Sequence, residues 1–237
     1  MAKTYEAIIK SESSGDVLLH SPPPDWRFLD FGDIKQTEEL YRKIASLRKN
    51  SKVFNFVSSQ EGEGVSTIVI NLVNYMLHRE DRSKILLIDA NLHHPVLHVG
   101  FNHTQKMGLA EVLCETCSCS EAISEIKPNN LYLMPSGSPR RNSLTDAGHN
   151  IFHKVISEIK SEYDCIFVDS SPLLTSADAL SVAVSSDVTF LITDTRQTRA
   201  AVAKKAKQFL QENDCVIGGV ILNWVKNPIP GWLYRNI

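Results

Sequence analysis

The stretch SSQEGEGVST (residues 58–67) has the residue types and spacing of a loop that binds phosphate. It follows a short apolar run and leads into a helical pattern, which is the setting in which such a loop works. Gly62 and Gly64 let the backbone turn its amide groups toward an anion, and the N-terminus of the next helix adds N–H groups and a positive dipole. The loop residues we expect to hold phosphate, with a hydroxyl for Mg²⁺ at their end, are Gly62, Glu63, Gly64, Val65, Ser66 and Thr67.

The loop lacks the lysine that such loops carry directly after their last glycine, because Val65 stands there. That lysine normally contacts the β- and γ-phosphates with charge-assisted hydrogen bonds worth roughly 1.5–3 kcal/mol each. It also neutralises charge that moves during transfer. Valine does neither, so the sequence predicts weak or absent binding of ATP or ADP with Mg²⁺ and inefficient phosphoryl transfer. A tight strand–helix turn without any ligand is the alternative for the loop taken alone.

Two further apolar runs end in aspartate. Asp89 closes the run at residues 85–88, and Asp169 closes the run at residues 165–168. Ligands of open parallel sheets lie beyond the carboxyl ends of the strands, so both side chains should lie beside the loop. A lone aspartate there is usually a turn residue. Two of them beside the loop predict a Mg²⁺ site made of Ser66, Asp89 and Asp169.

The elements that must position these side chains alternate along the chain. Apolar runs occupy residues 53–57, 85–88, 131–134, 165–168, 188–192 and 216–222, and helical patterns lie at 67–78, 151–161 and 200–211. A further helix is expected from Thr37, with Thr37 as its cap and a Glu38–Arg42 ion pair. Continuous apolar strands are buried on both faces. We therefore predict a doubly wound, three-layer α/β fold with a mostly parallel sheet flanked by helices on both faces, like that of phosphate-loop NTPases.

Composition limits the classes of function. The chain has 237 residues with a net charge of −2, which lacks the basic excess of a nucleic-acid binder. No apolar run approaches the ~18 residues of a membrane span, and the first residues lack a signal-peptide core. We expect a cytoplasmic protein with reduced cysteines. Residues 1–33 are expected to form a short helix, arm and linker, and residues 34–237 a single domain.

These motifs together resemble the cytoplasmic domain of bacterial tyrosine kinases, a family within the MinD/ParA-like nucleotide-binding proteins that acts in capsule and exopolysaccharide production. The resemblance spans nearly the whole chain. The stretches that carry it are KTYEAIIK (3–10), ELYR (39–42), SSQEGEGVST (58–67), LLIDANLHHP (86–95), IFVDSSP (166–172), TDTRQTR (193–199) and GVILNWV (219–225). It implies homo-oligomerisation through a helix bearing Glu39 and Arg42. It also implies a membrane co-polymerase or chain-length protein as partner, holding the chain at the inner face of the membrane.

The departures from the family pattern fall on its chemistry. The loop lysine is Val65, the second aspartate of the second motif is Asn91, and the last arginine of the oligomerisation motif is Ala45. The C-terminal tyrosine cluster is reduced to Tyr234. These changes predict a non-catalytic, kinase-like protein in which Asp89 and Asp169 are vestigial. The alternative is a working or weakly active ATP-dependent kinase or ATPase in which His93 or another group replaces the lost charge.

Three other features have an ordinary explanation, and two interpretations stay open for a fourth. The histidines and cysteines of residues 93–119 invite a metal site, but we interpret Cys114 as a core residue and the rest as turn residues. Arg140 and Arg141 are expected in a solvated loop, and Lys204, Lys205 and Lys207 on a solvated helix face. The tail NPIPGWLYRNI (227–237) could dock on a partner or a membrane surface, or pack on its own domain.

Overall fold

The computed structural model describes residues 34–79, 82–103, 107–138 and 151–225. Within this part of the chain, one seven-stranded sheet has the order β3-β4-β2-β5-β1-β6-β7, and every neighbouring pair is parallel except β3 with β4. The strands are β1 (Val53–Ser58), β2 (Ile85–Ala90), β3 (Ser124–Lys127), β4 (Leu131–Met134), β5 (Cys165–Ser170), β6 (Val188–Asp194) and β7 (Ile217–Asn223).

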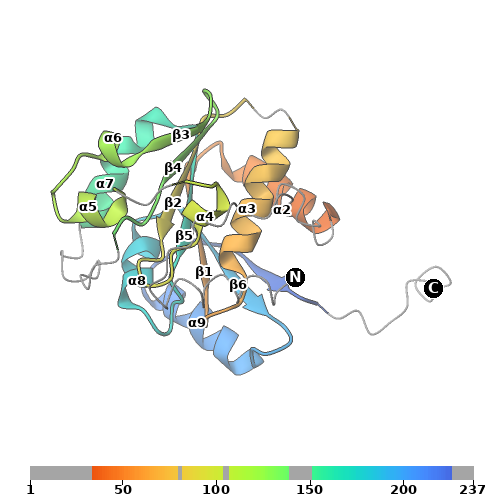
Figure 1. Ribbon diagram of the computed structural model, residues 1–237. Coiled ribbons are helices and arrows are strands. Elements are labelled where there is room, and N and C mark those ends of the chain that lie inside the picture. Colours follow the sequence, from red (N-terminus) through yellow and green to blue (C-terminus); the bar gives the residue numbers. More distant parts are fainter. Residues whose placement is uncertain (1–33, 80–81, 104–106, 139–150, 226–237) are drawn as a thin grey trace, which may run out of the picture. The chain divides into compact units, whose positions relative to one another are not determined.

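Helices cover both faces of this sheet (Figure 1). They are α2 (Ile34–Leu47), α3 (Val65–His78), α4 (Leu97–Gly100), α5 (Leu109–Leu113), α6 (Cys119–Ala122), α7 (Ile151–Ile159), α8 (Ala177–Val184) and α9 (Ala200–Glu212). Helix α3 packs on β1 and β5, with α2 outside it. The buried clusters that include α5 to α9 lie against the opposite face. The predicted three-layer, mostly parallel α/β fold is therefore confirmed.

The central strands are apolar because both of their faces are covered. Every residue of β1, β2, β5 and β6 is buried. On the α3 side the core is aromatic: the Phe56 ring stacks on Phe190 with centroids 5.4 Å apart and meets Phe167 edge-on at 6.0 Å. Such contacts add about 0.5–1.5 kcal/mol beyond area burial. A tightly packed centre gives the residues at the strand ends fixed positions.

The structure corrects several sequence-based boundaries. Helix α2 begins at Ile34, so Thr37 lies inside it and does not cap it, because no helix-breaking residue separates the two positions. The predicted Glu38–Arg42 pair is present at 2.7 Å. Strand β3 and the helices α4, α5, α6 and α8 were not predicted.

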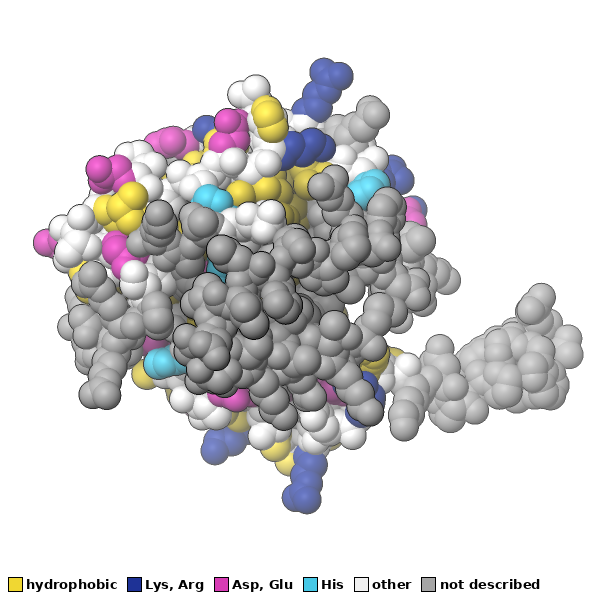
Figure 2. Space-filling model, viewed as in Figure 1, with side chains coloured by type: hydrophobic (Ala, Val, Ile, Leu, Met, Phe, Trp, Pro, Cys, Tyr) yellow, Lys and Arg dark blue, Asp and Glu magenta, His cyan; other side chains and the backbone are white. Residues whose placement is uncertain are grey.

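The surface carries charge of both signs. On the face shown in Figure 2, both basic and acidic side chains are visible among the described residues. The three lysines of α9 are exposed, as predicted. None of the described helices is long and apolar enough to cross a membrane. The predicted arm (residues 1–33), the loop with Arg140 and Arg141, and the tail (residues 227–237) lie outside the described residues.

Candidate phosphate and metal site

The phosphate loop runs directly from β1 into α3, as the sequence predicts. Gly62 and Gly64 have φ angles of 77° and 92°, in the left-handed region that favours glycine. Gly64 is the N-cap of α3 and no side chain caps this end, so the first N–H groups of the helix face the loop without a side-chain partner. Val65 begins the helix with only 8% of its surface exposed. The geometry of an anion-binding turn is thus present, and an apolar side chain fills the lysine position.

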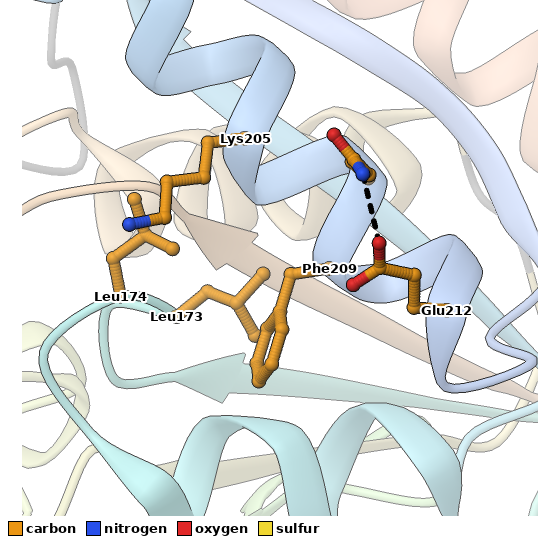
Figure 3. A pocket seen from close by; sticks show the side chains of 6 residues that line it. Leu173, Leu174, Lys205, Phe209 and Glu212 are labelled. Atoms are coloured by element: carbon orange, nitrogen blue, oxygen red, sulfur yellow. Dashed lines mark hydrogen bonds between the residues drawn. The ribbon is translucent and has the colours of Figure 1, made fainter.

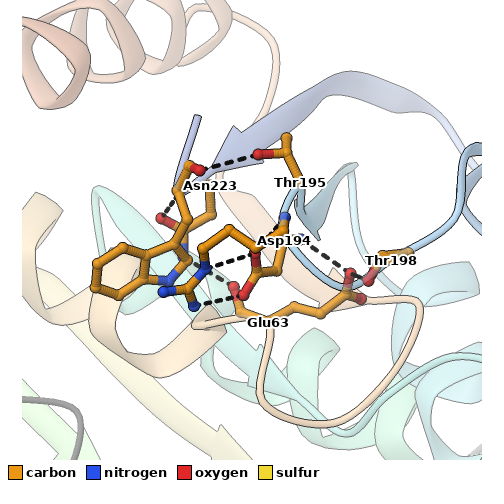
Figure 4. Close-up of polar contacts among 7 residues, drawn as sticks. Glu63, Asp194, Thr195, Thr198 and Asn223 are labelled. Atoms are coloured by element: carbon orange, nitrogen blue, oxygen red, sulfur yellow. Dashed lines mark hydrogen bonds and ion pairs between the residues drawn. The ribbon is translucent and has the colours of Figure 1, made fainter. Parts of the chain in front are cut away.

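The side chain of Glu63 turns back onto the loop itself, and it also reaches Asp194 and Thr198, as Figure 4 shows. One carboxylate oxygen accepts hydrogen bonds from the Ser59 amide (2.7 Å), the Ser59 hydroxyl (2.6 Å) and the Gln60 amide (2.8 Å). The other accepts from the Asp194 amide at 3.0 Å and the Thr198 hydroxyl at 2.5 Å. Glu63 is 1% exposed, so its carboxylate makes its hydrogen bonds inside the protein and does not face the solvent.

The ends of β6 and β7 complete the wall of the site, which sequence reasoning did not assign. The Asn223 side-chain amide donates to the Glu63 carbonyl at 2.9 Å. Arg196 forms a bidentate pair with Asp194, through Nε at 3.1 Å and Nη2 at 2.7 Å. Its guanidinium carbon lies 4.0 Å from the centroid of the Trp224 ring. These residues could have been predicted from their position in the sequence, because they lie at or just after the ends of two strands whose carboxyl ends lie at the ligand-binding edge of the sheet.

Asp89 and Asp169 lie side by side on the neighbouring strands β2 and β5, where they are register partners. Both are fully buried. Burial raises the pKa of Asp89 to about 7, against the opposing effect of backbone hydrogen bonds. Burial, together with the charge of Asp89, raises the pKa of Asp169 well above its usual range. No cation contributes to either shift. The predicted convergence of the two strand-end aspartates is therefore present.

The two carboxylates differ in their partners. Asp89 accepts from the amides of Val96 and Leu97, both at 3.0 Å, and so holds the segment that follows β2. Neither oxygen of Asp169 accepts a hydrogen bond from a described residue. The Ser66 side chain lowers the pKa of Asp169 but stays outside full hydrogen-bonding geometry. A buried carboxylate without partners is costly, and a hard divalent cation held with Ser66 fits this donor set. Thr67 is exposed at the helix surface.

The segment after β2 crosses the site. The Asn91 side-chain oxygen accepts from the Ser171 hydroxyl at 3.1 Å and the His94 amide at 3.2 Å. The His94 ring lies 3.7 Å from Glu61 of the phosphate loop, and the His93 ring lies 3.7 Å from Asp178 of α8. Both histidines are more than half exposed. Each therefore lies near one acidic side chain, and neither forms an ion pair with Asp89 or Asp169 among the described residues.

The cysteines and remaining histidines of residues 93–119 do not converge. In the described part of the chain, no three His, Cys, Asp or Glu side chains are grouped to hold a metal ion. Cys119 is the buried core residue, and Cys114 is only partly buried, which reverses the expectation for these two cysteines. Cys119 begins α6 and packs into the cluster around α5 and α7.

An open pocket of about 390 Å³ lies apart from the phosphate loop (Figure 3). Leu173 and Leu174, which follow the β5 motif, form one side. Lys205, Phe209 and Glu212 of α9 line the other. Neither aspartate lines it, so it is separate from the candidate site.

Comparison with known proteins agrees with this geometry. A family model described as an AAA domain matches residues 51–212. Tyrosine-protein kinase CpsD of Streptococcus pneumoniae is 28% identical over 195 residues, covering 80% of this chain and 85% of that protein.

Two solved structures share the fold. The kinase domain of the Escherichia coli tyrosine kinase ETK superposes with a TM-score of 0.76 at 18% identity, covering 92% of this chain and 88% of that one. The septum site-determining protein MinD of Pyrococcus horikoshii, complexed with Mg-ADP, superposes with a TM-score of 0.63 at 22% identity, covering 78% and 76%. The chain therefore belongs to the AAA domain family; in sequence it is similar to bacterial tyrosine kinases, and it shares its fold with the kinase domain of ETK and with MinD.

Proposed function

We propose that this protein is a kinase-like, non-catalytic component of bacterial exopolysaccharide or capsule assembly. The observation that carries the proposal is Val65, an apolar and buried side chain where the family has its loop lysine. The loop around Val65 has the backbone shape of an anion-binding turn. What it lacks is the positive charge of the lysine. The protein then acts through binding and oligomeric state, not through phosphoryl transfer.

The remaining groups fit a weakly held Mg–nucleotide. The loop from Gly62 and the N-terminus of α3 would hold its phosphates, and Ser66, Asp89 and Asp169 would hold its Mg²⁺, directly or through water. Bound there, Mg²⁺ would neutralise phosphate charge. The partnerless oxygens of Asp169 support this assignment. Because Val65 replaces the lysine, the loop would contribute no positively charged side chain of its own beside the Mg²⁺ ion.

Autophosphorylation tests the proposal directly. The purified protein, incubated with labelled ATP and Mg²⁺, is expected to incorporate no label on tyrosine, while the pneumococcal relative CpsD serves as a positive control. Robust labelling that disappears in Asp169→Ala would overturn the proposal. The same substitution distinguishes activity of this chain from that of a contaminating kinase.

The second candidate function is a working or weakly active ATP-dependent kinase or ATPase, and the retained pair Asp89 and Asp169 favours it. The two functions differ in nucleotide affinity. Calorimetric titration with ADP and Mg²⁺ that gives low-micromolar binding supports the enzyme. Weak or undetectable binding supports the non-catalytic component.

We propose a membrane co-polymerase or chain-length protein as the partner, which would hold this chain at the inner face of the cell membrane. Family resemblance supports this partner. Co-purification with the product of a neighbouring co-polymerase gene, lost when that gene is deleted, is the expected result. No association under mild extraction would contradict it.

Homo-oligomerisation through α2 is a separate proposal. Arg42 is 73% exposed and reaches only its own helix, at Glu38, among the described residues. Glu39 is exposed beside it. If α2 forms the contact between copies, Arg42→Glu reduces the oligomer measured by sedimentation, while Lys43→Glu on the same helix serves as the matched control. Equal effects of the two variants would argue against a specific contact.

A further inference from the structure

We propose that Glu63 is the positioning residue that gives the phosphate loop its shape. It does so through hydrogen bonds to the start of the loop and to residues at and after the end of β6. The expected effect of Glu63 on nucleotide affinity rests on the proposed nucleotide site. The effect on loop structure stands independently.

The Glu63 carboxylate closes the loop on itself. Its first oxygen gathers three donors from the beginning of the loop, all at Ser59 and Gln60. Its second oxygen accepts from Asp194, the last residue of β6, and from Thr198 in the turn before α9. A carboxylate has about four lone-pair positions, so these five contacts leave none of them free. The residue therefore fixes the start of the loop to a second, distant segment.

The main chain of Glu63 is held as well. Its carbonyl accepts the Asn223 side-chain amide at 2.9 Å, at the end of β7. Glu63 thus links the loop to β6 and β7, 131 and 160 residues away in sequence. It stands between Gly62 and Gly64, the two loop positions with positive φ. A residue held on both sides in this way keeps its neighbours in the left-handed conformation that the loop requires.

Glu63 is too deeply buried to be an ordinary surface residue of the loop. A buried carboxylate is tolerated only when it is paired or fully hydrogen-bonded. Among the described residues, no cation pairs with Glu63, and five donors satisfy it. The other loop glutamate behaves differently: Glu61 is 67% exposed and lies 3.7 Å from His94. Two glutamates two residues apart therefore offer a matched pair for experiment.

Glu63→Gln tests the role, with Glu61→Gln as the control. Glutamine keeps one accepting oxygen, so it cannot serve both groups of donors. In nucleotide-free protein, hydrogen exchange of the amides of Ser59 and Gln60, or of Asp194, is expected to accelerate at least about tenfold in Glu63→Gln, because a hydrogen bond to a charged group is lost. The affinity for ADP with Mg²⁺, where the wild type binds it, is expected to fall at least about tenfold, since the loop is misplaced.

The outcomes separate this inference from the proposed function. If the amides exchange at the same rate in Glu63→Gln as in Glu61→Gln, the inference is overturned. A loss of affinity for ADP without faster amide exchange also overturns it, because Glu63 would then contact the ligand directly. If the wild type binds no ADP, the proposed nucleotide site fails and the exchange result still decides the role of Glu63. If Glu63→Gln does not fold, two measurements remain. In the wild type, Ser59 and Gln60 amides that are not protected from hydrogen exchange would refute the inference. In Thr198→Val, faster exchange of the Asp194 amide would support it.

Discussion

At the scale of single residues, the site is defined by a local imbalance of charge. Asp89 and Asp169 are buried side by side, and no described cation reaches either of them. Relative to the family pattern, Val65 removes one positive charge and Asn91 removes one negative charge. The two departures therefore compensate each other electrostatically, which suits a site that must remain folded without its lysine.

The pair Asp89–Asp169 should destabilise the protein at neutral and alkaline pH. A carboxyl whose pKa is raised by folding stabilises the folded state most when protonated, and that stability is lost as pH rises through its folded pKa, which is about 7 for Asp89. We expect magnesium-free Asp169→Asn to be more stable than the wild type at pH 8, by at least about 1 kcal/mol, the value of one pKa unit. The gain should shrink toward pH 5. Thermal unfolding with a chelator at both pH values measures it.

Magnesium provides the control for that prediction. The ion should raise the melting temperature of the wild type at pH 8 and leave Asp169→Asn unchanged, because the variant lacks the partnerless carboxylate. A variant that is less stable than the wild type at every pH would mean that Asp169 has a partner that the geometry does not reveal.

Restoring the family residues should restore nucleotide affinity. Val65→Lys is expected to raise affinity for ADP with Mg²⁺ by about tenfold or more, since each charge-assisted hydrogen bond contributes about 1.5–3 kcal/mol. Asn91→Asp alone should destabilise the fold, because the backbone amide of Asn91 donates to Asp89 at 3.2 Å, so a carboxylate on this residue would add a third negative charge close to the buried pair. Combined with Val65→Lys, that cost should be smaller. Calorimetry and thermal unfolding of all three variants measure the coupling.

Val65→Met is the control for this series, because it adds length without charge. It should leave affinity unchanged. Equal affinity of the lysine and methionine variants would show that something other than the missing charge closes the site.

At the scale of elements, the sequence predicts what periodicity and apolar runs can encode. All six predicted strands and the helices at α3, α7 and α9 are present, because each has a long enough pattern. Strand β3 was missed because its four residues are alternately exposed and only half-buried. Helices α4, α5 and α6 were missed because four or five residues carry no helical period.

The same reasoning explains which parts of the site were predicted. Asp89 and Asp169 followed from a rule about strand ends, which needs no side-chain detail. The direction of Glu63 and the Asn223 contact depend on tertiary pairings over 131 and 160 residues. A local pattern does not encode such pairings, so Glu63 was predicted only as one more loop residue.

The junction between the loop and β7 makes Gly64 intolerant of a side chain. A Cβ there would lie 2.4 Å from the Asn223 side-chain nitrogen, and the φ of 92° is strained for other residues. Gly64→Ala is expected to destabilise the protein by about 1–3 kcal/mol, measured by chemical denaturation. Adding Asn223→Ala should recover part of the loss, because it relieves the clash and leaves the strain. Gly219→Ala, whose Cβ would lie 3.8 Å from Phe190, should cost less.

At the scale of the whole molecule, one acidic side chain joins three distant segments. Asp187, just before β6, accepts from the amides of Lys52 and Val53 at 2.7 and 2.9 Å. It also pairs with Lys160, after α7, at 2.6 Å. Burial by itself raises the pKa of Asp187, but the Lys160 hydrogen bond and the two amides outweigh it, so the net pKa is lowered.

Asp187 and the site aspartates should therefore give opposite pH dependences. A carboxyl with a lowered folded pKa stabilises the protein above its unfolded pKa, and this is lost as pH falls through the folded value. Asp187→Asn is expected to lower stability at pH 7 by about 1–2 kcal/mol, since it weakens bonds to a charged acceptor. The deficit should vanish at acid pH, where Asp169→Asn also loses its advantage. Thermal unfolding of both variants and the wild type from pH 3 to pH 8 measures the two trends. If both variants differ from the wild type in the same direction at every pH, the opposite roles of Asp187 and Asp169 are contradicted.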